Sequence, residues 1–194
     1  MVLINRIMKE ITLKIVYYGP GLSGKTTNIE HIYKNITPSN RGKMVSVKTD
    51  TERTLFFDFL PVDIGRVKGM NLRTHLYSVA GQVFYDASRR LILKGCDGII
   101  FVVDGQIERL DANIESIENL KKNMLMNSLI FDKVPMVVQY NKTDLPNSLK
   151  IEELQKIFNP DGKYSDFNAN ALNGRNVFET FKTIVRLIIK DMKI

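Results

Sequence analysis

The segment GPGLSGKTTN, from Gly19 to Asn28, contains the residues whose types and spacing point most directly to chemistry. It fits the pattern G-x-x-x-x-G-K-[ST] in full, between a strand-like run and a helix-like run, and this pattern binds phosphate. Backbone amides of such a loop cradle the α- and β-phosphates of a nucleotide, the lysine reaches the β- and γ-phosphates, and the threonine hydroxyl ligates Mg²⁺. We therefore predict a phosphate-binding loop whose contacts come from Gly19, Gly21, Leu22, Ser23, Gly24, Lys25, Thr26 and Thr27.

A second polar segment, Asn141-Lys142-Thr143-Asp144, follows the apolar run from Val134 to Tyr140. Ligands of open α/β sheets bind at the carboxyl ends of the strands, so this segment can reach a nucleotide held by the first loop. A carboxylate can accept from both the ring N–H and the exocyclic amine of guanine, whereas adenine offers no such pair. Asp144 therefore favours guanine. A different P-loop enzyme, an ATPase or kinase in which residues 141–144 are coincidental, stays open at this point.

Alternating strands and helices must position these segments. The run GIIFVVD, from Gly98 to Asp104, is continuously apolar, as expected of a central parallel strand buried on both faces. We predict an α/β fold with one mostly parallel six-stranded sheet, flanked by helices on both faces, in a single domain of residues 1–194. The predicted strands span residues 11–18, 54–62, 71–79, 98–104, 134–140 and 164–169, and the predicted helices span 25–35, 84–94, 109–126, 150–158 and 177–192.

Composition excludes several other classes of protein. The chain has 194 residues, of which 44% are hydrophobic and 25% charged, and it lacks any run of roughly 20 apolar residues that could span a bilayer. Its one cysteine, Cys96, cannot form an internal disulfide, so the default location is the cytoplasm. The net charge of +7 suits an acidic partner, a nucleic acid or an anionic bilayer. Because the basic residues are scattered, we expect no nucleic-acid function. Without a prenylation or myristoylation motif we expect no direct lipid anchor, so membrane contact must be indirect or electrostatic.

In the order and spacing of its motifs, the chain resembles the Ras-like small GTPases, which carry N-K-x-D where residues 141–144 stand. The resemblance implies that Asn141, Lys142 and Asp144 bind the guanine base. It also implies that Asn170-Ala171-Leu172 is a degenerate form of the S-A-K element, with the Ala171 amide facing the guanine oxygen and Leu172 in place of the usual lysine.

The segment from Ser78 to Gln82 is similar to the D-x-x-G-Q element of the same family, in which the glycine contacts the γ-phosphate and the glutamine orients the attacking water. Gly81 and Gln82 match, but Ser78 stands where the family has the aspartate that supports Mg²⁺. Either Mg²⁺ binds more weakly, or another carboxylate such as Asp58 compensates. In the first switch region Thr54 would close over Mg²⁺ and the γ-phosphate, beside Arg53.

Three long segments sharpen the resemblance to the MglA family of bacterial gliding-motility and polarity GTPases: KIVYYGPGLSGKTTN, ERTLFFDFLP and GQVFYDASRRLILKGCDGIIFVVD. The resemblance implies a GTP/GDP switch that hydrolyses GTP slowly, with Arg53, Gln82 and Lys25 as its catalytic residues and Thr26 and Thr54 as its Mg²⁺ ligands. It implies a homodimeric roadblock-fold activator of the MglB type, and polarity and motility effectors.

The resemblance also suggests a location and an alternative. The chain is expected to be monomeric alone and to be recruited by partners to the cell poles or the inner membrane face. The missing aspartate at Ser78 leaves a second hypothesis, a nucleotide-holding scaffold that has lost turnover.

Overall fold

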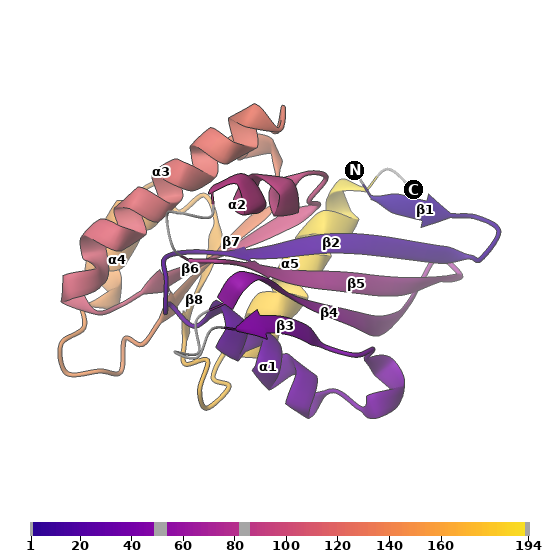
Figure 1. Cartoon of the computed structure of the whole chain (residues 1–194), viewed down its shortest axis with the longest axis horizontal. Helices are drawn as coiled ribbons and strands as arrows, with labels where there is room; N and C mark the ends of the chain where they lie inside the picture. The colour runs from indigo at the N-terminus through magenta and orange to yellow at the C-terminus, as the bar shows by residue number, and fades with distance from the viewer. Residues whose placement is uncertain (1, 49–53, 82–85, 193–194) are drawn as a thin grey trace.

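The structure, a computed structural model, describes residues 2–48, 54–81 and 86–192. Its sheet has eight strands, in the order β3-β4-β5-β2-β6-β7-β8, and β1 pairs with β2 (Figure 1). The strands are β1 Leu3–Asn5, β2 Glu10–Tyr18, β3 Val45–Lys48, β4 Thr54–Val67, β5 Met70–Val79, β6 Gly98–Asp104, β7 Met136–Asn141 and β8 Ser165–Ala169.

The centre of the sheet is parallel, as predicted. Strand β2 lies between β5 and β6, and β7 and β8 follow in the same direction. All seven residues of β6 and all six of β7 are buried, because helices cover both faces of these strands.

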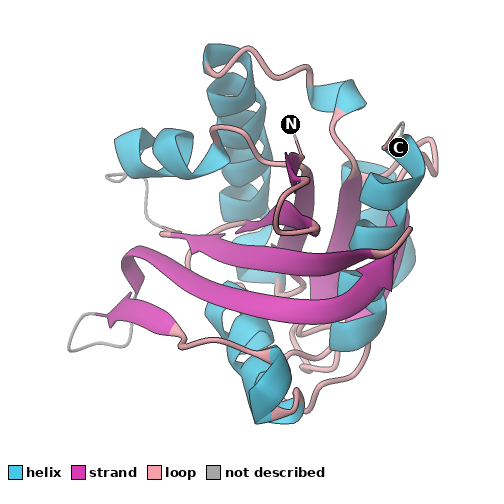
Figure 2. Cartoon of the chain, turned by 90° about the vertical axis from the view of Figure 1, so that its right-hand side faces the viewer, coloured by secondary structure: helices cyan, strands magenta, loops and turns pink. Residues whose placement is uncertain are grey.

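Helices pack on both faces of the sheet, so that two hydrophobic clusters form (Figures 1 and 2). On one face lie α1 Lys25–Asn35 and α5 Val177–Asp191, and on the other α2 Asp86–Leu93, α3 Leu110–Met126 and α4 Ile151–Phe158. Helix α5 buries Val177, Phe181, Ile184 and Ile188 at helical spacing, as its sequence predicts. Among the described helices, none is both long and apolar enough to cross a membrane.

The strand count of six was wrong, because the sequence analysis missed β1 and β3. All three residues of β1 are exposed, and in the four-residue β3 Val45 and Ser46 are exposed, so neither strand has the apolar alternation that marks a half-buried strand.

Strand β4 is also longer than the predicted strand 54–62, and it forms a hairpin with β5. The turn of this hairpin is Lys68-Gly69, both with positive φ, and Gly65 lies inside β4 where the pairing register shifts. Such a shift with a left-handed glycine is typical of a β-bulge, so Gly65 bends a strand that continues to Val67.

The parallel strands bring the predicted motifs to one edge of the sheet. The segments after β2, β5, β6, β7 and β8 all leave from the carboxyl ends of their strands, and these segments contain most of the predicted nucleotide contacts; Asn141 is the last residue of β7, and Thr54 begins the antiparallel β4. An open α/β sheet binds its ligands at this edge.

Candidate functional site

The loop between β2 and α1 has a conformation that requires its glycines. Gly19 and Gly24 have φ of 148° and 97°. A Cβ atom on Gly19 would lie 2.3 Å from the carbonyl oxygen of Val102, and one on Gly24 would lie 2.2 Å from Nδ2 of Asn141. A side chain at either position would therefore push the loop away from the neighbouring strands.

This loop leads directly into α1, which begins at Lys25 with no side-chain cap at Gly24. The amides of a first helical turn have no partner within the helix and attract anions. The hydroxyl oxygen of Ser23 is buried and has no hydrogen-bond partner among the described residues. Leu22 is exposed, while Thr26 and Thr27 lie half-buried in the first turn. The loop therefore suits a phosphate group.

Lys25 is buried, and its Nζ donates to the carbonyl oxygens of Gly19 and Pro20, at 3.0 and 2.6 Å. The pKa of Lys25 is lowered to about 7, first because burial disfavours the ammonium form and then because Arg89 is positively charged. A phosphate group beside Nζ would supply a negative charge next to this ammonium group and would favour its protonated form.

A buried carboxylate lies beside the first turn of α1. Asp58 on β4 is paired in register with Ser78 on β5, and its side chain is fully buried. It accepts hydrogen bonds from the hydroxyls of Thr26, at 2.5 Å, Ser46 and Ser78. The structure thus places Asp58 between Ser78 and the predicted Mg²⁺ ligand Thr26, where the compensation hypothesis needs a carboxylate.

These oxygen atoms fit the Mg²⁺ that small GTPases use. Hydroxyl and carboxylate oxygens are hard ligands, and Mg²⁺ is commonly bound through one or two protein groups together with nucleotide phosphates. Thr26 would ligate the ion, which would neutralise phosphate charge, and Asp58 would supply negative charge beside it. Among the described residues, no group of three or more His, Cys, Asp and Glu side chains could hold a metal by itself.

The predicted base-binding segments are joined to the phosphate loop by Asn141. Its Nδ2 donates to the carbonyl oxygen of Ser23, at 2.7 Å, and its Oδ1 accepts from the amide of Ala171, at 2.9 Å. The Ala171 amide, expected to face the guanine oxygen, is directed to Asn141 in this structure. Asn141 therefore ties three loops from different strands together.

The remaining residues predicted to bind the base lie at the surface of the same edge. Asp144 is exposed and accepts from Nδ2 of Asn170, at 3.0 Å. Leu172, which replaces the usual lysine, is 85% exposed and belongs to neither of the two hydrophobic clusters. A carboxylate that is accessible and oriented by an amide is suited to receive the two N–H groups of guanine.

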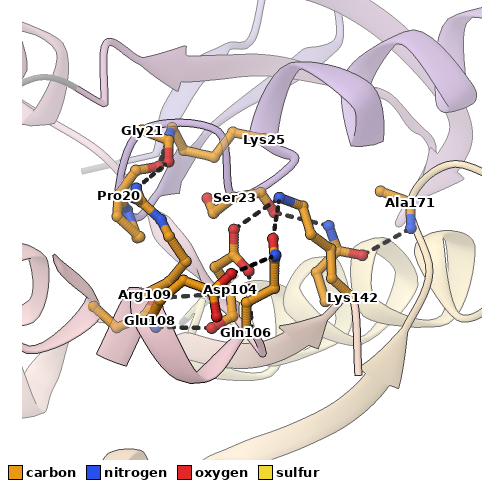
Figure 3. Close-up of polar contacts among 12 residues, drawn as sticks. Pro20, Gly21, Ser23, Lys25, Asp104, Gln106, Glu108, Arg109, Lys142 and Ala171 are labelled. Carbon is orange, nitrogen blue, oxygen red and sulfur yellow. Dashed lines mark hydrogen bonds and ion pairs between the residues drawn. The ribbon is translucent and has the colours of Figure 1, made fainter. Parts of the chain in front are cut away.

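Lys142 forms an ion pair with Asp104 at the end of β6, with 2.8 Å between Nζ and Oδ2 (Figure 3). No pattern in the sequence indicates this partner. Asp104 is buried, and its Oδ1 also accepts from the amide of Gln106. The ion pair fixes the stem of Lys142 across the loop that follows β6.

Gly81 lies against the phosphate loop. A Cβ atom on Gly81 would lie 2.2 Å from Cα of Gly21 and 2.4 Å from its amide nitrogen, so only glycine permits this approach. The predicted catalytic residues Gln82 and Arg53 lie outside the described residues, and for Thr54 only its place at the start of β4 is described.

Two arginines near the phosphate loop were missed. Arg109, just before α3, donates from NH2 to the carbonyl oxygen of Gly21, at 2.8 Å (Figure 3), and buried Arg89 donates from Nε to the carbonyl oxygen of Ala80, at 2.9 Å. Arg89 could have been suspected, because it shares the buried face of α2 with Ile92 and Leu93. No pattern in the sequence around Arg109 indicates its contact with the phosphate loop.

A mostly parallel α/β sheet, a phosphate loop before α1 and a base segment after β7 define the class of small GTPases. Within that class, the ADP-ribosylation factor family model matches residues 2–187, and the chain belongs to this family.

Individual relatives agree with this assignment. The mutual gliding-motility protein MglA of Myxococcus xanthus is 50% identical over 193 residues, which cover 100% of this chain and 98% of that protein. ADP-ribosylation factor-related protein 1 of Rattus norvegicus is 24% identical, covering 92% and 86%. ADP-ribosylation factor-like protein 6 of Caenorhabditis elegans is 24% identical, covering 93% and 89%. The predicted resemblance to the MglA family is confirmed.

Proposed function

We propose that this chain is a GTP/GDP switch that hydrolyses GTP slowly. The observation that carries this proposal is the contact between Gly81 and Gly21, since Gly81 belongs to the segment similar to D-x-x-G-Q, the expected second switch element, and lies directly against the phosphate loop. A γ-phosphate bound between these two glycines would change their separation. The positions of the two switch segments, around Thr54 and Gly81, would then depend on whether GTP or GDP is bound.

In the proposed reaction Gln82 orients the attacking water and Arg53 neutralises charge that develops on the transferred phosphoryl group. Lys25 contacts the β- and γ-phosphates, while Thr26 and Thr54 supply hydroxyl ligands for Mg²⁺. An arginine delivered within the same chain can accelerate hydrolysis by ~10³-fold or more. The support for Arg53 and Gln82 is their match to the family motifs.

The cellular role is proposed from the relative named for gliding motility. The chain would act in cell polarity, gliding motility or both, through effectors that bind its GTP form. A homodimeric roadblock-type activator would stimulate hydrolysis. The protein would be monomeric on its own and would act in the cytoplasm, where partners would direct it to the poles or the inner membrane face.

Single-turnover hydrolysis of preloaded GTP tests this function, with the unaltered protein compared with Gln82→Leu and Arg53→Ala. We expect turnover that both substitutions abolish. A matched control, Lys156→Gln on α4, changes an exposed charge on a helix away from the phosphate loop and should leave the rate unchanged. If excess ATP displaces the bound nucleotide as well as GTP does, the guanine assignment fails.

The presence of Ser78 instead of aspartate favours a second candidate, a scaffold that holds GTP without turnover. If GTP loads and stays intact in all variants, a roadblock-type homodimer is added next. Hydrolysis after that addition supports the switch, and its absence supports the scaffold.

A further inference from the structure

Two turns lie side by side at the end of the sheet opposite to the phosphate loop. The β1–β2 turn spans residues 6–9 and the β4–β5 turn is Lys68-Gly69; we call them together the hairpin tips. They are neighbours because β2 and β5 are parallel and in register, and the carbonyl oxygen of Lys9 accepts from the amide of Asn71, at 2.7 Å. Figure 1 shows both at the right-hand end of the sheet.

The first of these turns exposes large apolar side chains. Ile7 is 94% exposed and Met8 is 69% exposed, and Leu3 on the adjoining β1 is 68% exposed. A single exposed apolar residue is ordinary, but three within six positions at one projecting end form a patch that lacks cover from the described residues.

Basic residues surround this patch. Arg6 and Lys9 flank the apolar pair, and Arg66 and Lys68 lie in the neighbouring hairpin, all four of them exposed. No aspartate or glutamate occurs in residues 1–9 or 64–72.

The nearest carboxylates on these strands carry two negative charges, of which one arginine balances one, so most of the positive charge at the tips remains in excess. Glu10 and Asp63 each form an ion pair with Arg73, at 3.3 and 2.7 Å. The hairpin tips therefore present a net positive charge around exposed apolar side chains, a combination suited to the headgroup boundary of an anionic bilayer.

We propose that the hairpin tips bind directly to the surface of an anionic lipid bilayer. Arg6, Lys9, Arg66 and Lys68 would contact lipid phosphates, while Ile7 and Met8 would enter the boundary between headgroups and acyl chains. Strand β2 has nine residues between the tips and the phosphate loop, which corresponds to about 30 Å at about 3.3 Å per residue. Bound in this way, the protein would keep its nucleotide edge away from the membrane and accessible to other proteins.

Vesicle co-sedimentation with the full chain tests this proposal. One set of vesicles contains phosphatidylcholine alone, and in the other about a third of the lipid is phosphatidylglycerol. We expect binding to the anionic vesicles only, and a strong loss of binding when the salt concentration rises from about 0.1 M to about 1 M. Equal binding to both kinds of vesicle, or binding to neither, overturns the proposal.

The variant Arg6→Gln/Lys9→Gln locates the contact. A basic residue near an anionic surface contributes roughly fivefold to binding, so this variant should bind about 25-fold more weakly, and Ile7→Ser should also weaken binding. The matched control Lys122→Gln/Lys156→Gln removes two exposed charges from α3 and α4. If the control loses as much binding as the turn variant, net charge is responsible and the hairpin tips are not the site.

The proposal and the proposed switch function fail independently. Vesicle binding requires no nucleotide turnover, and loading with a fluorescent guanine nucleotide verifies that each variant is folded. A turn variant that loads nucleotide normally but releases the vesicles supports the proposal, whereas one that loads normally and binds vesicles as tightly as the unaltered protein contradicts it.

Discussion

Replacing Asp58 by asparagine removes the charge of a fully buried carboxylate at almost unchanged size. The substitution asks whether Asp58 supplies the negative charge that the family's aspartate provides where this chain has Ser78. Asp58 accepts hydroxyl hydrogen bonds from Thr26, Ser46 and Ser78, so an amide oxygen can retain part of the network. The charge is therefore the main thing that changes.

The size of the effect follows from one distance. Oδ2 of Asp58 lies 2.5 Å from Oγ1 of Thr26. An ion ligated by Thr26 at about 2.1 Å would then lie within about 4.6 Å of the carboxylate oxygen. A double positive and a single negative charge at that separation interact by roughly 2 kcal/mol at the dielectric constant of water, and by more inside a protein. The value of roughly 2 kcal/mol predicts that Asp58→Asn needs about 30-fold more Mg²⁺ to fill half of its sites.

The assay is the release rate of a fluorescent GDP analogue, followed over a range of Mg²⁺ concentrations. We expect the midpoint of the Mg²⁺ dependence to rise about 30-fold in Asp58→Asn. The double variant Asp58→Asn/Ser78→Asp moves the carboxylate to the residue paired with position 58 and should restore much of the shift. An unchanged midpoint in Asp58→Asn would refute the compensation argument, whatever the double variant does.

Three further substitutions test the packing and electrostatics around the phosphate loop. The pKa of Lys25 is about 7 without nucleotide and is raised when phosphate pairs with the ammonium, so binding at about pH 8.5 should take up close to one proton; calorimetry in buffers of different ionisation enthalpy should show this for the unaltered protein and not for Lys25→Met. Since unfolded Lys25 keeps its proton up to its ordinary pKa of 10.5, the unfolding free energy of the nucleotide-free protein should rise with pH from about 7 to about 9, where ionisation of the unfolded Cys96 thiol, whose pKa burial raises in the folded protein, begins to oppose the rise; a flat profile between these values would contradict the lowered pKa of Lys25. Gly81→Ala would place a methyl group 2.2 Å from the Cα of Gly21, so we expect a loss of roughly 1–3 kcal/mol in stability, and an unchanged melting temperature would show that the close approach is absent. Asn28→Ala leaves the buried amide of Gln139 without its reciprocal partner, at a cost of roughly 1–3 kcal/mol in denaturant unfolding, and Asn28→Ala/Gln139→Leu should recover part of it.

Long segments with a clear apolar pattern could be predicted from the sequence. Strand β6 and helix α1 have the predicted bounds, because continuous apolar runs and punctuating glycines are local signals. Strands β1 and β3 escaped because they are short and largely exposed, and a short edge strand is held by backbone pairing that leaves little trace in side-chain type.

The candidate site also has residues that the sequence could predict and residues that it could not. Residues within contiguous motifs, such as Lys25 and Asn141, could be predicted because the spacing of each motif is visible in the sequence. Arg109 approaches Gly21 across 88 positions of sequence, and only the fold brings them together. Asp58 could be predicted only in part. The absence of an aspartate at Ser78 suggested that another carboxylate compensates, but only the register of the β4–β5 hairpin shows that residues 58 and 78 are paired.

The connections of the phosphate loop differ between its two sides, and this difference bears on how a switch could work. On the base side, Asn141 joins the loop to Ala171 through two hydrogen bonds of a buried side chain, and Gly24 packs against the same amide group. On the other side, Gly81 only touches the loop, and Asp58 is joined to it through the hydroxyl of Thr26, a group that an incoming metal ion would also use. Under the proposed function, base recognition would rest on contacts that need not change with the number of phosphates, whereas the contacts of Gly81 and Asp58 are those that a γ-phosphate and its metal would have to rearrange. A protein built in this way can hold either nucleotide firmly and still differ in the segments that partners would read.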